Sequence, residues 1–162
     1  MNKMNDIYLR KADYRDLDLL FIWANDETVR ENAFNTQMIK FEEHVQWFKE
    51  KIISDRCMIY IYCQGDTPIG QGRIDIDGAE GIISYSIDKS YRFRGHGRIL
   101  LELLEAAVDS DLPAVEVLVA KVKKANIASQ RKFDQRLYDK TEKDDYFEYR
   151  KSKGTDYALH PS

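Results

Sequence analysis

The segment 89–98, Lys-Ser-Tyr-Arg-Phe-Arg-Gly-His-Gly-Arg, combines arginines and glycines at a spacing that suits phosphate binding. Arg92, Gly95 and Gly97 form the pattern R-x-x-G-x-G between a strand-like run and a helix-like run. Glycines at such a turn let the backbone curl so that several N–H groups point inward, and the N-terminus of the following helix adds about half a positive charge. We therefore expect a pyrophosphate cradle here, the alternative being a tight helix-entry turn with solvated arginines.

Apolar and polar side chains alternate from Ile83 to Asp88, directly before this segment. This period of two predicts a strand whose more polar face looks onto the site. The loop that follows is neither of the two common nucleotide-binding loops, because no Gly-Lys-Ser/Thr follows and the pattern G-x-G-x-x-G is absent. A cofactor that contains a nucleotide diphosphate, bound in another geometry, stays open as an interpretation of this loop.

The rest of the chain alternates short strand-like and longer helix-like runs, without an internal repeat or a linker. Hydrophobic periodicity predicts helices over 13–25, 41–52, 99–108 and 126–135. It predicts strands over 7–12, 58–63, 68–76, 82–88, 114–121, 138–142 and 147–152. The predicted order is therefore β-α-α-β-β-β-α-β-α-β-β, with a polar segment, 26–40, between the first two helices.

Length and composition favour one domain over residues 1–152, followed by a loose C-terminal tail, 153–162. The 162 residues are 43% hydrophobic and 33% charged, and the net charge of -3 provides no overall positive field for nucleic acid. No apolar run reaches the 18 or so residues of a membrane span, and the N-terminus lacks the apolar core of a signal peptide, so we expect a cytoplasmic protein. Cys57 and Cys63 lack metal-site spacing, so we expect reduced core thiols and no metal.

Two motifs resemble signatures of the GNAT superfamily of N-acetyltransferases. The pattern at residues 92–97 resembles the family's acetyl-CoA signature, and residues 126–133, Asn-Ile-Ala-Ser-Gln-Arg-Lys-Phe, resemble its N-x-x-A/S helix. The predicted order of elements is similar to the family's fold over nearly the whole chain. The resemblance implies an α+β fold, with a twisted, mixed and mostly antiparallel central sheet flanked by helices. It also implies acetyl-CoA as the acetyl donor and direct transfer to a primary amine, without an acyl-enzyme.

The resemblance further implies which residues hold the donor. Main-chain groups of the strand 84–87 would hold the pantetheine arm and polarise the thioester carbonyl, and the loop 92–98 would bind the pyrophosphate. For Asn126 and Ser129 the alternatives are a helix cap and a surface serine. The candidates for donor binding are Tyr85, Ser86, Ile87, Arg92, Phe93, Arg94, Gly95, His96, Gly97, Arg98, Asn126, Ser129 and Phe133.

Three residues depart from the family's pattern. Phe93 stands where many members have a first glycine, and Leu137 replaces a glycine before the penultimate strand. Phe133 occupies a position where many members carry a tyrosine that is proposed to protonate the leaving thiolate. We therefore expect water or another hydroxyl, such as that of Tyr138, to supply the proton.

Acetyl transfer needs a neutral amine, a stabilised oxyanion and a protonated leaving thiolate. Candidate catalytic residues besides Tyr138 are Glu80, Asp75, Ser84 relaying through water, and Asn126. The sequence singles out none of them, and for the carboxylates the alternative is a solvated position at a strand edge.

The N-terminal half is similar to GNAT domains of pseudaminic-acid and related nucleotide-sugar pathways, some of which are fused to a UDP-sugar hydrolase. The likeness lies in residues 23–35, 42–48, 70–75 and 124–129. It implies that the acceptor is the 4-amino group of a UDP-linked deoxyaminosugar. The candidates for acceptor binding are Asn25, Arg30, Phe34, His44 and Trp47. For the aromatic and polar residues in this set the alternatives are core packing and solvation.

Two other functions stay open at this point. One is acetylation of a protein N-terminus or of an aminoglycoside, which related GNAT branches perform. The other is a non-catalytic acyl-CoA-binding module, which the lack of a tyrosine at position 133 favours. The expected partner is a small-molecule amine, with no nucleic acid and no membrane, and we expect a monomer or a homodimer.

Overall fold

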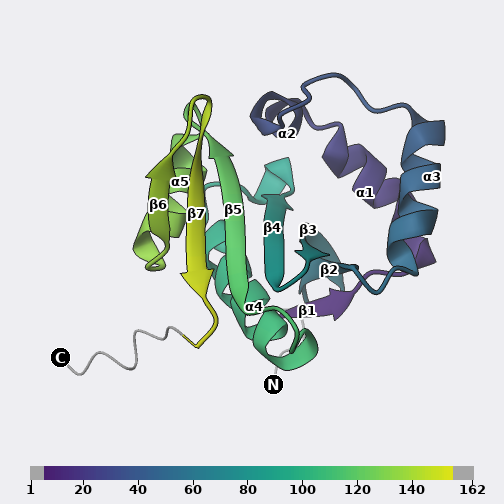
Figure 1. The fold of residues 1–162 in the computed structure, drawn as a ribbon. Coiled ribbons are helices and arrows are strands. Elements are labelled where there is room, and N and C mark those ends of the chain that lie inside the picture. The colour runs from purple at the N-terminus through teal and green to yellow at the C-terminus, as the bar shows by residue number, and fades with distance from the viewer. Residues whose placement is uncertain (1–5, 155–162) are drawn as a thin grey trace.

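The computed structural model describes residues 6–154 and contains one sheet of seven strands in the order β1-β2-β3-β4-β5-β7-β6 (Figure 1). Neighbouring strands are antiparallel except β4 and β5, so the α+β class and the mixed, mostly antiparallel sheet are confirmed. The strands are β1 (Ile7–Lys11), β2 (Cys57–Gln64), β3 (Thr67–Asp77), β4 (Glu80–Ile87), β5 (Val117–Lys123), β6 (Asp139–Glu142) and β7 (Tyr146–Ser152). The helices are α1 (Leu17–Ala24), α2 (Glu27–Asn32), α3 (Phe41–Ile52), α4 (His96–Asp111) and α5 (Ile127–Gln135), with 3-10 turns η2 (Tyr14–Asp16) and η3 (Lys89–Tyr91).

The predicted elements are present with bounds shifted by a few residues, and one helix was missed. The polar segment 26–40 contains α2, which begins where the Asp26 side chain accepts a hydrogen bond from Val29 N–H at 3.2 Å. No residue of α2 is buried, so no hydrophobic periodicity marks this helix in the sequence. Most of the predicted C-terminal tail, 155–162, lies outside the described residues.

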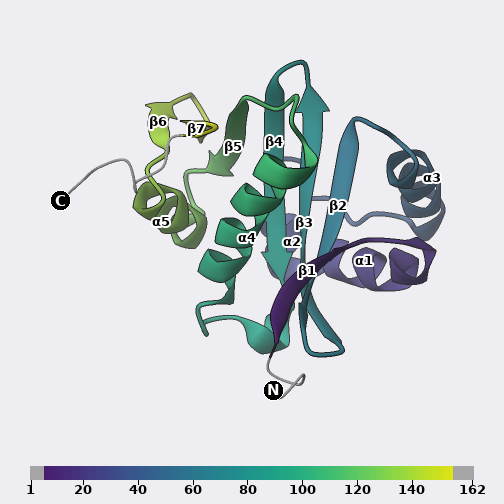
Figure 2. The same ribbon diagram turned by 90° about the horizontal axis from the view of Figure 1, so that it is seen from below.

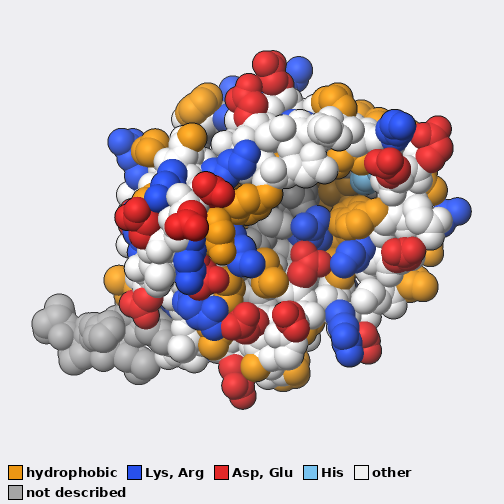
Figure 3. Space-filling view, turned by 45° about the horizontal axis from the view of Figure 1, so that its top comes forward, with side chains coloured by type: hydrophobic (Ala, Val, Ile, Leu, Met, Phe, Trp, Pro, Cys, Tyr) orange, Lys and Arg blue, Asp and Glu red, His pale blue; other side chains and the backbone are white. Residues whose placement is uncertain are grey.

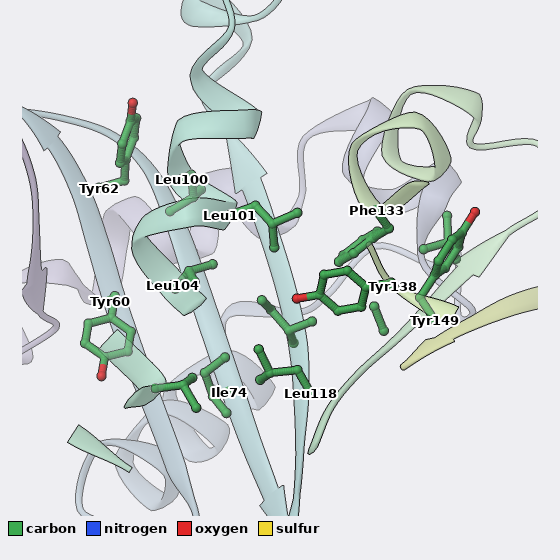
Figure 4. Packing of buried hydrophobic residues seen from close by; sticks show 14 of the residues in the cluster. Tyr60, Tyr62, Ile74, Leu100, Leu101, Leu104, Leu118, Phe133, Tyr138 and Tyr149 are labelled. Carbon is green, nitrogen blue, oxygen red and sulfur yellow. The ribbon is translucent and has the colours of Figure 1, made fainter. Parts of the chain in front are cut away.

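Helices pack on both faces of the sheet and form two clusters of buried residues. On one face α4 lies across β3 and β4 (Figure 2), and Leu104 packs with strand residues such as Ile74 (Figure 4). On the other face α1 and α3 bury Trp23 and Phe48 against β2, and both cysteines lie free in this cluster, as expected. Within residues 6–154 no helix is long and apolar enough to cross a membrane.

The pairing of β4 with β5 is short, so 83–87 of β4 have no strand partner on the β5 side. The two strands pair only over 80–82 and 117–119. On its other edge β4 stays paired with β3 to its end, so β4 itself continues regularly through 83–87. Backbone N–H and C=O groups that a neighbouring strand does not pair need another partner. The sheet therefore opens at a defined point, with free backbone groups of β4 along one side.

Gly72 lies where β3 passes closest to α4, since a Cβ atom there would be 2.5 Å from a methyl carbon of Leu104. Leu104 is fully buried and cannot move aside freely. We expect Gly72→Val to lower the free energy of unfolding by about 1–3 kcal/mol, the usual cost of overpacking a core. Urea denaturation measures this, with Thr67→Val at the exposed start of β3 as the control. Equal midpoints for the two variants would contradict the close packing.

Candidate functional site

A cleft of about 1030 Å³ lies where β4 and β5 diverge. One side is formed by 83–87 of β4, 120–122 of β5, α5 and the start of α4, and the other side by residues of α1, α2 and α3. Figure 3 shows a hollow near the middle of this face, with Lys and Arg side chains around it. A cleft of this size is at the upper end for ligand sites and can hold a large ligand beside a second, smaller one.

The loop between β4 and α4 has the backbone geometry of an anion cradle. Gly95 adopts a left-handed conformation, with φ of 83°, directly before α4. Phe93 also has a positive φ, 66°, and its side chain is fully exposed. A left-handed conformation costs a residue other than glycine roughly 1–2 kcal/mol, so Phe93 adopts at this cost a conformation that suits glycine. The first N–H groups of α4 have no partner within the helix, and this fits a pyrophosphate.

Basic side chains add positive charge around the cradle. Arg98, Arg131 and Lys132 line this part of the cleft, and burial lowers the pKa of Lys132. A Cβ atom at Gly97 would lie 2.4 Å from the Lys132 side chain, so the glycine lets α5 approach the start of α4. The backbone cradle and these cations together fit the phosphate groups of acetyl-CoA.

Twelve of the thirteen residues predicted to bind the donor line the cleft. Arg94 is the exception, because its guanidinium lies over the Tyr91 ring, 5.7 Å from the centroid. His96, the first residue of α4, makes a 2.9 Å hydrogen bond through Nδ1 with the hydroxyl of Tyr62. Burial and the neighbouring Arg94 lower the pKa of His96. The sequence motif therefore located this half of the cleft.

Arg92, the arginine of the motif, is held by protein groups rather than left free for phosphate. Its Nη2 donates to Asp26 Oδ1 at 2.7 Å, and its Nε donates to the carbonyl of Ile87 at 3.0 Å. Burial alone would raise the pKa of Asp26, but hydrogen bonds from Arg92 and from backbone N–H groups outweigh it and lower the pKa. Nearby, Trp23 Nε1 donates to Asp88 Oδ2 at 2.9 Å. These bonds tie the end of β4 to α1 and α2.

The wall between β4 and α5 is formed by a hydroxyl pair and an aromatic ring. Tyr85 Oη and Ser129 Oγ lie 3.1 Å apart, and the Asn126 side chain caps α5 by accepting from Ser129 N–H at 3.2 Å. Phe133 is buried, stacks on Tyr149 and meets Tyr85 edge-on at 6.1 Å between ring centroids. Burial raises the pKa of Tyr85 to about 12, so its hydroxyl stays protonated near neutral pH. The Asn126 side chain thus caps α5, which was the alternative to donor binding, and the residue lies in the cleft lining.

Tyr138 is not placed to protonate a group in the cleft, which corrects that expectation. It lies outside the cleft lining, within the core, and its ring meets Phe133 edge-on at 4.9 Å (Figure 4). Its hydroxyl is buried, and burial together with the Glu105 carboxylate raises its pKa far above the usual value. Folding of α5 against β7 directs this residue inward.

Glu80 lies at the start of β4, apart from the residues that line the cleft. It lies at the closed end of the opening, where β4 still pairs with β5, and it is absent from the cleft lining. Its carboxylate forms an ion pair with Arg150 of β7. Ser84, in contrast, lines the cleft and lies opposite Arg73 in the register of β3 and β4.

Asn25 and Arg30, expected to bind the acceptor, shape the loop around α2 instead. The side chain of Asn25 makes two hydrogen bonds with the backbone of Ile39, at 2.9 and 2.8 Å, and lies outside the cleft lining. Arg30 lines the cleft, but it donates to three backbone carbonyls at 2.7, 2.9 and 3.2 Å. Polar residues in a segment without core contacts need such bonds to hold one conformation.

The segment after α2 reaches across to β5 and β7. Phe34 does not line the cleft, and its ring meets Tyr146 edge-on at 5.5 Å. Lys123 Nζ donates to the carbonyl of Glu31 at 3.1 Å. Phe34 therefore joins the two sides of the molecule, which is a different role from the expected acceptor contact.

His44 and Trp47 do line the cleft, as expected for the acceptor side. His44 is buried, with Nε2 2.9 Å from the carbonyl of Leu17, and its ring stacks near Trp47 at 5.8 Å. The sequence analysis missed two charged residues beside them, Glu43 on α3 and Arg73 on β3. Glu43 is four residues before Trp47, on the same helix face, and that spacing could have indicated it.

The tie between Arg92 and Asp26 predicts coupled effects on stability. We expect Arg92→Gln and Asp26→Asn each to lower the free energy of unfolding by about 1–2 kcal/mol, because each removes a charge-assisted hydrogen bond. The double variant should lose less than the sum, with a coupling of about 0.5–3 kcal/mol. Urea denaturation of the four proteins measures the coupling, and Arg98→Gln, whose exposed side chain pairs with Glu102, is the control. Strict additivity would show that the tie is absent in solution.

Comparison with known proteins places these observations in a family. The sequence profile described as Acetyltransferase (GNAT) domain matches residues 6–134, whereas the comparison with curated proteins found no match. Among solved structures, the spermidine N-acetyltransferase from Vibrio cholerae in complex with CoA and spermine is 12% identical, with a TM-score of 0.83, over 94% of this chain and 97% of that chain. RimL, a ribosomal L7/L12 alpha-N-protein acetyltransferase in complex with CoA, is 15% identical, with a TM-score of 0.78, over 93% and 96%.

The Campylobacter jejuni N-acetyltransferase PseH is 20% identical, with a TM-score of 0.70, over 91% of this chain and 99% of that chain. At these identities the solved structures show a shared fold, and the sequence profile covers most of the chain. The cradle before α4 and the opening between β4 and β5 lie within the part of the chain that the profile matches. The chain therefore belongs to the GNAT family of acetyltransferases, whose acetyl donor is acetyl-CoA.

Proposed function

We propose that this acetyltransferase acts on the amino group of an anionic acceptor, a nucleotide-linked deoxyaminosugar, with the 4-amino group of a UDP-linked sugar as the favoured site. The charge of the cleft carries this proposal. Among the described residues that line the cleft there are seven Lys and Arg side chains and one carboxylate, that of Glu43. Three of the seven, Arg73, Arg92 and Arg98, also form ion pairs with carboxylates outside the lining, so the lining keeps a smaller excess of positive charge. Arg98, Arg131 and Lys132 line the donor half around the start of α4 and α5, and Arg30 and Arg73 line the acceptor half. Arg92 lies in the loop between β4 and α4, and Lys121 lies on β5. Such a site attracts an anionic acceptor and repels a polyamine or an aminoglycoside.

The sequence adds support for a nucleotide sugar. By their names, the structural neighbours include acetyltransferases of a polyamine and of a ribosomal protein, so the fold does not select an acceptor. The likeness of 23–35 and 42–48 to GNAT domains of nucleotide-sugar pathways concerns the part of the chain that forms the acceptor side. Trp47 in that wall carries the guanidinium of Arg73 over its ring, so the indole holds a cation at the acceptor side.

The chain's own backbone positions the donor. Residues 83–87 of β4 have no strand partner on the β5 side, so the N–H and C=O groups that point to that side, apart from the Ile87 carbonyl that Arg92 binds, can pair with the pantetheine amides as a further strand would. The same edge offers N–H groups to the thioester carbonyl, where negative charge develops during transfer. The cradle at Gly95 holds the pyrophosphate at the far end. Orientation by these backbone groups supplies much of the rate acceleration.

Proton transfers in this scheme use the groups that the cleft presents. Glu43 takes a proton from the acceptor ammonium, directly or through a water molecule, so that the neutral amine can attack. The amine nitrogen forms a bond to the acetyl carbon, the bond from that carbon to sulfur breaks, and the thiolate leaves. The nitrogen, which is cationic after the attack, gives its extra proton to water and becomes the neutral amide. The hydroxyl pair of Tyr85 and Ser129 donates a hydrogen bond to the thiolate, in place of the tyrosine that Phe133 replaces.

A steady-state assay of CoA release from acetyl-CoA tests the acceptor class. The panel contains UDP-linked 4-amino-4-deoxysugars, aminoglycosides, spermidine and short peptides, and Gly97→Trp is the control for the donor site, because a large side chain there meets Lys132. We expect turnover of the UDP-aminosugars with kcat/KM at least tenfold above the cationic amines. Preferred turnover of spermidine or aminoglycosides would contradict the proposal, and acetyl-CoA binding without any turnover would indicate the acyl-CoA-binding module.

The role of Glu43 predicts a pH-dependent defect. We expect Glu43→Gln to lower kcat by about 10–100-fold at pH 7 and to recover rate as the pH rises, because solvent then deprotonates the amine. The KM for acetyl-CoA should stay unchanged. Glu50→Gln, two turns further along the same helix and outside the cleft lining, is the matched control. A defect in Glu43→Gln that is the same at every pH would assign Glu43 to binding rather than to proton transfer.

A further inference from the structure

We propose that Arg73 determines acceptor specificity by binding an anionic oxygen group, phosphate or carboxylate, that the acceptor carries close to its amine. This rests on the proposed function and deepens it, because it names the recognising residue and the chemical group that it requires. Arg73 comes from β3, one strand away from the part of β4 where the thioester would lie. Neither the glycine motif nor the likeness of the N-terminal half includes a role for it.

Asp75 and Trp47 hold the guanidinium of Arg73 in one orientation. Its Nε donates to Asp75 Oδ2 at 2.8 Å, and its Cζ lies 5.2 Å from the centroid of the Trp47 ring. Lys51 approaches the other oxygen of Asp75 at 3.5 Å. A guanidinium that is stacked on an indole and anchored through Nε loses little further freedom when it binds a ligand. The residue is thus prepared for binding before the acceptor arrives.

The anchored guanidinium still has donors to offer. No described residue accepts a hydrogen bond from its Nη1 or Nη2, and Arg73 lines the cleft, whereas Asp75 and Lys51 do not. Two cations and one carboxylate leave this group of three with a charge of +1. Two parallel N–H groups of a guanidinium match the paired oxygens of a phosphate or a carboxylate. The cleft therefore presents a fixed cationic fork to an incoming acceptor.

The surrounding groups set where the charge of the acceptor must lie. Arg73 is opposite Ser84 in the β3–β4 register, and neighbouring strands are about 4.8 Å apart, so the Arg73 backbone lies one strand spacing from β4 while its guanidinium lies over Trp47 in the cleft lining. The one carboxylate in the cleft lining of the described chain, Glu43, precedes Trp47 by one helical turn. An acceptor that places its amine toward Glu43 and its anionic group toward Arg73 interacts with both side chains. An amine without an anionic group interacts only with Glu43.

Anion binding can be measured separately from turnover. Wild type and Arg73→Gln, both saturated with CoA so that the donor phosphate sites are filled, are titrated calorimetrically with UDP, inorganic pyrophosphate and malonate. We expect the wild type to bind at least one of these anions and Arg73→Gln to bind it at least tenfold more weakly. Binding of the phosphate probes alone identifies a phosphate group, and binding of malonate alone identifies a carboxylate.

Two further variants distinguish recognition from general charge. Arg73→Lys keeps the charge but loses the planar fork, so it should recover only part of the affinity. Arg56→Gln, an exposed arginine outside the cleft, is the control and should bind as the wild type does. Binding of no anion by the CoA-loaded wild type, or equal binding by Arg73→Gln, would overturn the inference. If anion binding depends on Arg73 but UDP-aminosugars are not turned over, the result would contradict the proposed sugar substrate and would still support an anionic acceptor.

Discussion

The short pairing of β4 with β5 is the constraint on which the rest of the structure depends. Three residue pairs hold the two strands together, and beyond them each strand has a separate partner, β3 for β4 and β7 for β5. Because both outer pairings continue, neither strand loses its regular shape when the two diverge. The opening therefore has stiff walls, and one of them carries unpaired backbone groups that a ligand can use.

Long-range polar and aromatic contacts then fix the acceptor side against the sheet. Arg92 with Asp26 and Trp23 with Asp88 tie α1 and α2 to the end of β4. On the opposite wall, Lys123 contacts the backbone of α2. These bonds take the place of a hydrophobic core in a segment where α2 buries no residue. A segment held by a few directional bonds can vary in sequence while the donor site stays constant, which suits a family with many acceptors.

The charge of the cleft is opposite to the charge of the chain. The whole protein has a net charge of -3, whereas the described cleft lining has seven Lys and Arg side chains and a single carboxylate. Overall charge governs solubility and long-range attraction, but a ligand inside a cleft responds to the groups within a few ångströms. The cleft of an acidic protein can for this reason be locally basic.

The sequence by itself determined the order of strands and helices and the position of the donor cradle, because periodicity and the glycine motif depend on residues that are neighbours along the chain. It missed α2, which has no apolar face, and it did not show that Glu80 pairs with Arg150 or that Tyr138 packs against Phe133 in the core. Only the tertiary structure decided which polar side chains reach the cleft and which are held elsewhere. Arg92 meets Asp26 across 66 positions of sequence, and Arg73 meets Trp47 from another element, so no local pattern contains these partnerships.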